Sequence, residues 1–434
     1  MYYDITKPTA PTMPTLGKGT ECIKLLLSQV SKDMHEPLVP MLFPILGAHV
    51  SGAAFQYPDL SWKELCGQMA NLVADSGCNK GQLSLLVEAI CRDFRKHDES
   101  ELQRLVEWQK QVKTKGANKE KPARPDVAFW FPPSDTTRPA FIQNSVACEA
   151  GGGRTQYMNM PEVEMLDCLC GSHRQVTQMC RNIYDMQRAG ALRATADGVV
   201  GNPILRTCMT ISSTPIATRK FYKGDLFNGT FGRMVFSYKA RTSRNGRIPR
   251  IGKFNDDFYQ ELDEYLARLD ICKGRYIIRP LNKLTDHLAQ DMASLGDLTD
   301  DDVLWDISKR SLVSAWKAGC VMWVLNGQTW THSMGEIVEY LVWHDLWSKM
   351  RIFSDLLKEG DTSTSEASRK GPANMLDDLP ETFNEAQLDA LRESVGKRKD
   401  GTMKQLRVWM SRGFVEYSSQ TGLYSKTEAY LNRS

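Results

Sequence analysis

The sequence predicts an α/β fold, in which strands alternate with helices and form a parallel sheet covered by helices on its faces. Short apolar segments at 72–73, 127–131, 157–160, 207–211 and 234–238 have the length and composition of buried strands. Longer segments with apolar residues at helical spacing separate them. The chain has 434 residues, which is enough for two or three domains.

The composition is that of an ordinary folded protein, with 25% charged and 41% hydrophobic residues. No N-terminal secretory pattern is visible, and the apolar run from Leu312 to Leu325 contains Lys317 and is too short to span a bilayer. Eleven cysteines without a C-x-x-C pair favour free thiols. We therefore expect a cytoplasmic protein without a membrane partner. The net charge of +3 does not by itself indicate nucleic-acid binding.

Composition shifts divide the chain into five expected parts. An N-terminal arm and helices occupy residues 1–55, and the α/β core follows at 56–253. A helical domain is expected at 254–360, and it includes the helices 302–325 and 334–357. A linker rich in Asp, Ser and Thr (361–382) leads to a small module at 383–434.

A small-residue turn with a lysine at its exit joins the first strand to an amphipathic helix. The expected ligand-binding residues of this turn are Ser76, Gly77, Cys78, Asn79, Lys80, Gly81 and Gln82. Backbone N–H groups at a helix N-terminus, together with a lysine ammonium, can hold a polyphosphate. Only the lysine matches the usual pattern of G-x-x-x-x-G-K followed by Ser or Thr. An ordinary polar turn between strand and helix is the alternative.

Two acids and two hydroxyls follow later strands. Glu162 and Glu164 come after the strand 157–160, and open α/β sheets bind ligands at the carboxyl ends of their strands. They are catalytic candidates, and Glu162 is also a metal-ligand candidate; acids that stabilise a helix N-terminus are the alternative. Ser213 and Thr214 end the next strand, where they can orient a water or end the strand in a plain turn.

An arginine precedes the last strand of the expected sheet. Arg233 follows the glycine-containing turn 229–232. It can neutralise charge in a transition state, including that of a neighbouring subunit. A surface arginine without such a role is the alternative.

In this order, the segments 74–81, 160–162, 211–215 and 228–233 resemble the helicase domain of primase-helicases carried by bacterial mobile elements and phages. That family is related to poxvirus-type and superfamily-3 helicases. The resemblance implies an AAA-like P-loop NTPase core that uses ATP and Mg²⁺ and assembles into a homo-oligomeric ring, expected to be a hexamer. No primase motif is visible, so a separate primase is an expected partner.

The resemblance also implies roles for single residues. Lys80 would bind the β- and γ-phosphates, Glu162 would polarise the attacking water with Glu164 as its rival, and Arg233 would act across the subunit boundary. The hydroxyls of 213–214 would serve as the sensor. The sequence departs from the family pattern where no Ser or Thr follows Lys80, and where a proline precedes Glu162 in the place of an aspartate. Weaker Mg²⁺ binding, or loss of hydrolysis, is the consequence to be tested.

Two basic segments are candidates for DNA contact. Arg188 and Arg193 precede Asp197-Gly198, a dipeptide that strongly favours a hairpin turn. The related helicases carry a DNA-gripping hairpin at a similar place, so both arginines are expected to face a central pore and hold a single strand. A surface hairpin is the alternative.

The second basic segment runs from 239 to 253 without an acid. Its expected DNA-binding residues are Arg241, Arg244, Arg247 and Arg250, and Lys239 and Lys253 flank them. Such a run suits phosphate contacts. A solvated loop is the alternative.

The C-terminal module resembles a winged helix-turn-helix. A helix is expected over 383–395, a second from Thr402 with a capping box at Thr402 and Gln405, and a two-stranded wing over 414–426. The exposed basic residues Lys404, Arg407 and Arg412 would contact DNA. Binding of a protein partner is the alternative.

These expectations define a function. The first hypothesis is an ATP-dependent DNA helicase or DNA-remodelling ring in the replication of a mobile element or phage. The alternative is a catalytically degenerate P-loop scaffold or regulator that binds DNA, oligomerises and recruits replication partners.

Overall fold

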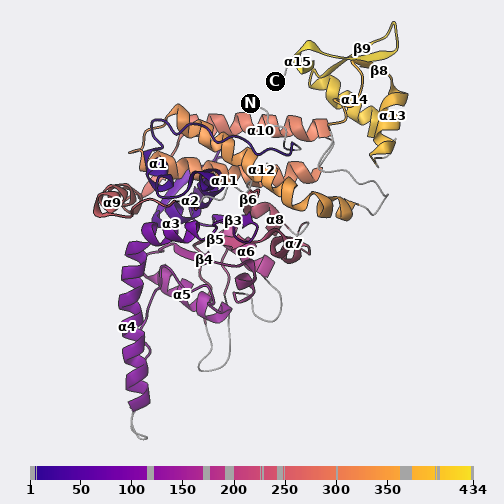
Figure 1. Cartoon of the computed structure of the whole chain (residues 1–434). Helices are drawn as coiled ribbons and strands as arrows, with labels where there is room; N and C mark the ends of the chain where they lie inside the picture. The colour runs from indigo at the N-terminus through magenta and orange to yellow at the C-terminus, as the bar shows by residue number, and fades with distance from the viewer. Residues whose placement is uncertain are drawn as a thin grey trace.

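The structure is a computed structural model with two hydrophobic cores (Figure 1). It describes residues 5, 7–114, 122–169, 176–190, 200–224, 226, 229–241, 248, 250–299, 302–361, 374–395, 397 and 401–431. The first core joins buried residues between Ile5 and Leu356, so the arm, the sheet and the helical region share one interior. The second core includes Met375 and Leu376, so the C-terminal module begins within the expected linker 361–382.

The central sheet has four parallel strands in the order β4-β5-β3-β6. These strands are β3 (Met69–Ala74), β4 (Gln156–Met160), β5 (Thr207–Ser213) and β6 (Val235–Lys239). The predicted α/β class with a parallel sheet is therefore confirmed. All six residues of β3 are buried, as expected for a central strand covered on both faces.

Besides the strands of this sheet, the described residues up to 361 form a further set of helices and strands. They are α1 (Glu21–Leu27), η1 (Lys32–Met34), α2 (His35–His49), β1 (Ala53–Gln56), β2 (Trp62–Glu64), α3 (Gln82–Ile90), α4 (Arg92–Thr114), α5 (Arg138–Ala150), η2 (Val163–Asp167), α6 (Val176–Tyr184), α7 (Pro215–Tyr222), α8 (Thr230–Arg233), α9 (Asp256–Asp270), β7 (Gly274–Tyr276), α10 (Arg279–Thr299), α11 (Asp302–Leu325) and α12 (His332–Asp361). The strands β2, β1 and β7 form a second small sheet. The predicted helices at 302–325 and 334–357 are confirmed as α11 and α12.

The predicted strand at 127–131 is wrong. This segment is irregular, because its N–H groups bond to side chains instead of a neighbouring strand. Asp98 of α4 accepts hydrogen bonds from the N–H groups of Trp130 and Phe131, at 2.8 and 2.7 Å. The segment still touches the edge of the sheet, where Tyr157 N donates to Trp130 O at 2.8 Å.

Helix α2 lies on one face of the sheet and is buried on all sides from residue 37 to residue 49. A helix that is apolar all round belongs in a core, which explains the burial. Its Pro40 has no N–H, which leaves the carbonyl of Glu36 without its helical donor. The Tyr340 hydroxyl donates to that carbonyl at 3.1 Å and replaces the missing bond.

Aromatic side chains cover the opposite face. Successive residues of a strand point to opposite sides of a sheet. Ser237 Oγ donates to Pro37 O of α2, whereas Phe236 packs against Tyr222, Phe231 and Phe353 of α7, α8 and α12. The sheet is therefore the middle layer between α2 and these three helices.

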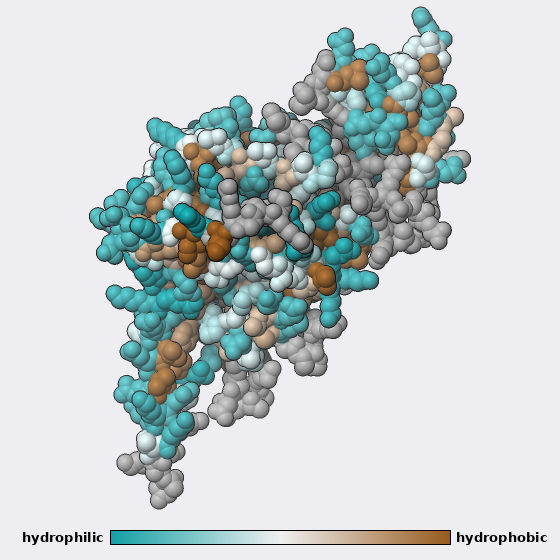
Figure 2. All heavy atoms as spheres, in the orientation of Figure 1, coloured by the Kyte–Doolittle hydropathy of each residue, from teal (hydrophilic) through white to brown (hydrophobic). Residues whose placement is uncertain are grey.

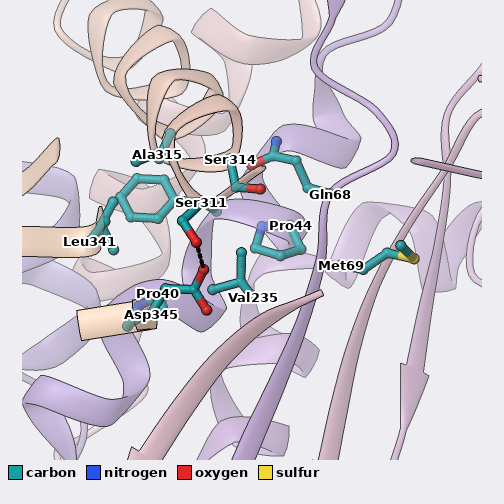
Figure 3. Close-up of a pocket in the computed structure, with 12 residues that line it drawn as sticks. Pro40, Pro44, Gln68, Met69, Val235, Ser311, Ser314, Ala315, Leu341 and Asp345 are labelled. Atoms are coloured by element: carbon teal, nitrogen blue, oxygen red, sulfur yellow. Dashed lines mark hydrogen bonds between the residues drawn. The ribbon is translucent and has the colours of Figure 1, made fainter. Parts of the chain in front are cut away.

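Helix α12 also closes the open edge of β6. The Phe236 N–H donates to Asp345 Oδ1 at 2.7 Å, and the Tyr238 N–H donates to Ser348 Oγ at 3.0 Å. Beside this contact, a cavity of about 20 Å³ is lined by residues of α2, α11 and α12 and by the first residue of β3 (Figure 3). It holds about one water, so it is no ligand pocket.

Helix α4 extends away from the rest of the chain (Figure 1) and carries a small apolar patch on an otherwise hydrophilic face (Figure 2). Leu102 and Val106 of this helix are 53% and 40% exposed.

Among the helices described, none has the length and apolar character needed to cross a membrane.

In its described residues, the C-terminal module has three helices and three strands. They are β8 (Thr382–Phe383), α13 (Glu385–Ser394), α14 (Thr402–Ser411), β9 (Val415–Ser418), β10 (Leu423–Lys426) and α15 (Glu428–Leu431). The strands are antiparallel in the order β8-β10-β9. The two expected helices and the two-stranded ribbon are present, and β8 is an additional strand.

The capping box predicted at Thr402 is wrong. Gly401 is the N-cap of α14, and the Thr402 hydroxyl bonds to Asp389 of α13 instead. The capping box lies at α13, where Asn384 and Gln387 bond reciprocally. Both segments carry the same local pattern, and tertiary contacts decide which of them forms it.

Candidate functional site

The loop between β3 and α3 turns through two left-handed residues. Gly77 has φ +80° and Asn79 has φ +61°. Asparagine tolerates this backbone region better than other side chains do. Asn79 occupies the position where the usual phosphate-binding pattern has its second glycine, and its backbone conformation is one that glycine also adopts.

Lys80 lies across the carboxyl ends of the two central strands. Its Nζ donates to Ala74 O, just at the end of β3, and to Ser213 O at the end of β5, both at 3.0 Å. No carboxylate of the described residues lies within ion-pair distance of this ammonium. Its positive charge is therefore not neutralised by a protein acid at the edge of the sheet.

The backbone of the same loop supplies further donors. Within the described chain, Cys78 is the one residue from 76 to 81 whose N–H has a protein acceptor, Asp75 O at 3.3 Å. The N–H groups of Ser76, Gly77, Asn79, Lys80 and Gly81 remain for another acceptor. With Lys80 and the N-terminus of α3, they form a site suited to an anion with several oxygens.

The side chain of Gln82, a predicted ligand-binding residue, is used within the chain. Its Oε1 accepts from the Ser31 N–H at 2.8 Å, and its Nε2 donates to Ser31 Oγ at 2.9 Å. These bonds fasten the segment before η1 to the start of α3. Gln82 thus holds the loop in place instead of facing the anion site.

The predicted acids follow β4 at the same edge of the sheet. Met160 pairs with Ile211, and Ile211 pairs with Asn71, so Glu162 is level with the end of β5. Neighbouring strands lie about 4.8 Å apart, which puts this position two strand spacings, about 10 Å, from β3. Glu162 and Glu164 are exposed, and no ion pair involves either of them in the described parts.

The Ser213 hydroxyl points into the interior. Its Oγ donates to Asn71 Oδ1 at 2.8 Å, lies 2.5 Å from Thr218 Oγ1 and is fully buried. It is therefore the backbone carbonyl of Ser213, and not its hydroxyl, that meets Lys80. The Thr214 hydroxyl accepts from the Ala217 N–H at 3.3 Å and caps α7. Sequence reasoning missed the buried partners of Ser213, because no local pattern marks them.

Arg233 ends α8, directly before β6, and is held within its own chain. Its Nη2 lies 2.7 Å from Asp185 Oδ2, and its Nη1 donates to Gly229 O at 2.8 Å. The side chain is 13% exposed. The contacts of Asp185 with Arg233 and with Arg310 were not expected from the sequence.

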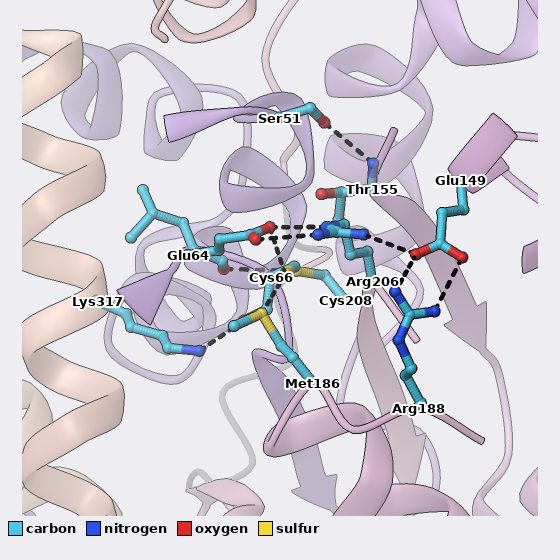
Figure 4. A network of polar contacts seen from close by, with 11 residues as sticks. Ser51, Glu64, Cys66, Glu149, Thr155, Met186, Arg188, Arg206, Cys208 and Lys317 are labelled. Atoms are coloured by element: carbon cyan, nitrogen blue, oxygen red, sulfur yellow. Dashed lines mark hydrogen bonds and ion pairs between the residues drawn. The ribbon is translucent and has the colours of Figure 1, made fainter. Parts of the chain in front are cut away.

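The predicted hairpin has an antiparallel stem. Arg188 pairs with Ile204, and the Ala189 N–H donates to Pro203 O at 3.1 Å. Arg188 is 56% exposed and lies 3.5 Å from Glu149 (Figure 4). The expected turn at Asp197-Gly198, together with Arg193, lies outside the described residues.

One member of the second basic segment is not on the surface. Lys239 is buried, and its Nζ forms an ion pair with Asp33 and donates to Asp33 O at 2.8 Å. Its expected place among solvent-facing cations is therefore wrong. Arg241 and Arg250 are exposed, and Arg244 and Arg247 lie outside the described residues.

Helix α14 is amphipathic. Leu406 and Trp409 are buried in the second core, while Lys404 and Arg407 are exposed. Arg412, the C-cap, is exposed as well. The three predicted basic residues therefore lie at the surface of the module.

A separate cluster, missed by sequence reasoning, joins α2, α4 and α9. His49 Nδ1 lies 3.3 Å from Asp270 and 4.0 Å from Asp93, and its Nε2 bonds to Ile90 O at 3.0 Å. Arg154 lies 3.3 Å from Asp270. Burial opposes ionisation of Asp270, but its bond to His49 and the charge of Arg154 hold its pKa below the usual value. Both ring nitrogens of His49 face oxygen acceptors, and Arg154 already contacts Asp270, so contacts within the chain occupy these groups and account for the cluster as a structural polar network.

Comparisons with known proteins do not assign a family. No protein-family model matches the chain, and no curated protein matches it significantly.

Proposed function

We propose that this protein is a P-loop ATPase of the AAA-like type that acts on DNA as a helicase or remodelling ring. The observation that carries the proposal is the position of Lys80, which bridges the ends of β3 and β5 beside a loop of unused N–H donors. A triphosphate supplies oxygens for both kinds of donor. The order β4-β5-β3-β6 supports the proposal, because only β5 separates the acid-bearing end of β4 from the loop-bearing β3.

The residues present fit ATP better than they fit Mg²⁺. Lys80 and the loop N–H groups match the phosphates, and an exposed carboxylate at Glu162 can hold a metal ion or polarise water. No hydroxyl follows Lys80, since Gly81 and Gln82 occupy those positions. When bound, the metal ion would neutralise phosphate charge.

Two surfaces support a DNA substrate. The hairpin stem that carries Arg188 leads into the amino end of β5, opposite the sheet edge where Lys80 lies. Arg241 and Arg250 follow the carboxyl end of β6. In the C-terminal module, the sequence β8-α13-α14-β9-β10 supports a winged helix-turn-helix whose basic α14 contacts DNA phosphates. A hexameric ring, in which Arg233 reaches a neighbouring site, and a separate primase partner belong to the same proposal.

A second candidate is a degenerate scaffold that binds nucleotide and DNA without turnover. It is favoured by the buried Ser213 hydroxyl and by the missing hydroxyl after Lys80, because both reduce the groups left for chemistry. The scaffold would still use Lys80 for nucleotide binding.

ATP hydrolysis by the full chain, with and without single-stranded DNA, separates the two. The motor predicts DNA-stimulated hydrolysis that is lost in Lys80→Ala and kept in Lys220→Ala, an exposed lysine on α7. Tight DNA and ATP binding without hydrolysis would support the scaffold. Hydrolysis unaffected by Lys80→Ala would contradict the proposed site.

A further inference from the structure

Two arginines meet at a single carboxylate on the side of the molecule where β6 begins. Arg233 donates to Asp185 Oδ2 from Nη2 at 2.7 Å and from Nε at 3.2 Å. Arg310 of α11 places its Nη1 3.7 Å from Asp185 Oδ1. Of the carboxylates in the described ranges, Asp185 alone lies within ion-pair distance of these guanidiniums.

The surroundings carry excess positive charge. Arg233, Arg310 and Lys317 all lie over the ring of the buried Tyr184, with 5.7, 5.7 and 5.6 Å from their charged groups to its centroid. Two guanidiniums therefore face one carboxylate, whereas Lys317 contacts the Tyr184 ring and donates to Cys66 O. Guanidiniums bind carboxylate and phosphate oxygens with the same forked geometry, so a phosphate is an alternative occupant.

The backbone holds Arg233 independently of Asp185. Its Nη1 donates to Gly229 O at 2.8 Å, and Gly229 has φ +80°. A Cβ at Gly229 would lie 2.8 Å from the same Nη1, so a larger residue would displace the guanidinium, and the positive φ also favours glycine. Arg233 therefore keeps its anchor when the carboxylate moves away.

Asp185 is joined to the hairpin stem by one residue. Met186, two residues beyond the end of α6, has φ +49°, and the Gln187 N–H donates back to Asn182 O at 2.8 Å. The carbonyl of Gln187 then accepts from the Leu205 N–H of the opposite stem strand, at 3.4 Å. A displacement of the stem is thus transmitted to Asp185 across a single left-handed residue.

The stem itself is tethered by charges that a nucleic-acid backbone can replace. Glu149 lies 3.5 Å from Arg188 and 3.8 Å from Arg206, and Arg206 also bonds to Glu64 at 2.8 Å (Figure 4). Arg188 is the exposed member of this chain of ion pairs. A phosphate bound to Arg188 competes with Glu149 and loosens the stem.

We propose that Asp185 is the internal occupant of a phosphate cradle formed by Arg233 and Arg310, and that it leaves the cradle when a bound strand displaces the hairpin stem. Asp185 is then a positioning residue that ties hydrolysis to strand binding, and Arg310 joins Arg233 in contacting the phosphate of an adjacent copy. The inference rests on the ATPase function proposed above.

The first test compares ATP turnover of wild type and Asp185→Asn at saturating ATP, with and without single-stranded DNA. We expect the basal rate to rise about fivefold or more and the stimulation by DNA to shrink by the same factor. Asp185→Glu should restore the wild-type ratio. Asp263→Asn is the matched control, since it removes an exposed ion pair with Arg92 elsewhere and should leave the ratio unchanged.

The second test is Arg310→Ala, which a side chain that is 40% exposed should tolerate. We expect DNA-stimulated kcat to fall about tenfold or more with unchanged affinity for ATP. An unchanged stimulation ratio in Asp185→Asn, or a parallel loss of both rates with a lower melting temperature, would overturn the cradle alone. Absence of any Lys80-dependent turnover in wild type would overturn the ATPase function, and the cradle with it.

Discussion

The ammonium of Lys80 lies 3.0 Å from the backbone carbonyl of Ser213, a residue 133 positions further along the chain. A second bond of 3.0 Å to Ala74 O centres the charge between β3 and β5. The lysine is thus ordered at the edge of the sheet before any ligand arrives. An ordered side chain loses less conformational entropy on binding, which favours affinity.

The loop conformation at Asn79 gives the first prediction. Because its φ is +61°, Asn79→Gly should keep both the fold of the loop and the affinity for ATP. Asn79→Val should lower the free energy of unfolding by about 1–2 kcal/mol, since a β-branched residue is strained there. Denaturant unfolding and titration with a fluorescent ATP analogue measure the two effects. Equal behaviour of the two variants would show that the left-handed turn is not needed.

Arg233 gives the second prediction. Arg233→Ala should lower ATP turnover by about 10³–10⁵-fold, because a transition-state arginine is worth that much. Nucleotide binding should stay nearly intact, since Lys80 and the loop N–H groups are untouched. Arg219→Ala is the control, as Arg219 forms an exposed pair with Asp355. Steady-state kinetics decide the matter, and unchanged turnover would remove Arg233 from this role.

Local patterns predicted the parts of the fold that depend on neighbouring residues. Burial within a single element gives α11 and α12 their helical spacing of apolar residues and gives β3 and β5 their continuous apolar segments. The structure contains all four elements. The segment 127–131 has the same composition but is irregular, because Asp98 supplies acceptors that no strand pattern reveals. Composition therefore predicts burial there, but not a strand.

The candidate site was predictable to the same extent. The sequence predicted that Lys80 and the strand ends carrying Glu162 and Ser213 lie at one edge of the sheet, because the carboxyl ends of parallel strands point the same way. The direction of the Ser213 hydroxyl depends on Asn71, and the partner of Arg233 lies 48 positions away. Such long-range pairs leave no mark in local spacing.

His344 gives the third prediction, on pH dependence. Burial lowers its pKa to about 3, and its ring bonds to Ser237 Oγ at 3.0 Å and to Tyr340 OH at 3.2 Å. The unfolded chain protonates this histidine near its ordinary pKa of about 6.5, so below that pH protons favour unfolding. Its contribution to stability is complete above about pH 6.5 and falls by about 1.4 kcal/mol per pH unit below it.

The measurement is denaturant unfolding of wild type and His344→Gln between about pH 7.5 and pH 5. Glutamine retains a donor and an acceptor but does not titrate, so the stability difference between the two proteins should narrow as pH falls. A difference that is constant with pH would show that His344 takes up a proton as readily in the folded state as in the unfolded chain, which would contradict the lowered pKa.

The buried pair of Asp345 and Lys349 gives the last prediction. The two side chains are 2% and 0% exposed and lie 2.7 Å apart, and Asp345 also accepts from the Phe236 N–H of the sheet edge. Removing one member of a buried pair costs about 3–5 kcal/mol, because the other charge loses its partner. Asp345→Ala should lower the free energy of unfolding by about this amount. Burial already lowers the pKa of Lys349, so its ammonium is destabilised further when Asp345 is removed. Adding Lys349→Met should recover most of the loss, since an apolar side chain needs no counter-charge. Denaturant unfolding of the single and double variants forms a complete cycle, in which additive losses would mean that the two charges are not coupled.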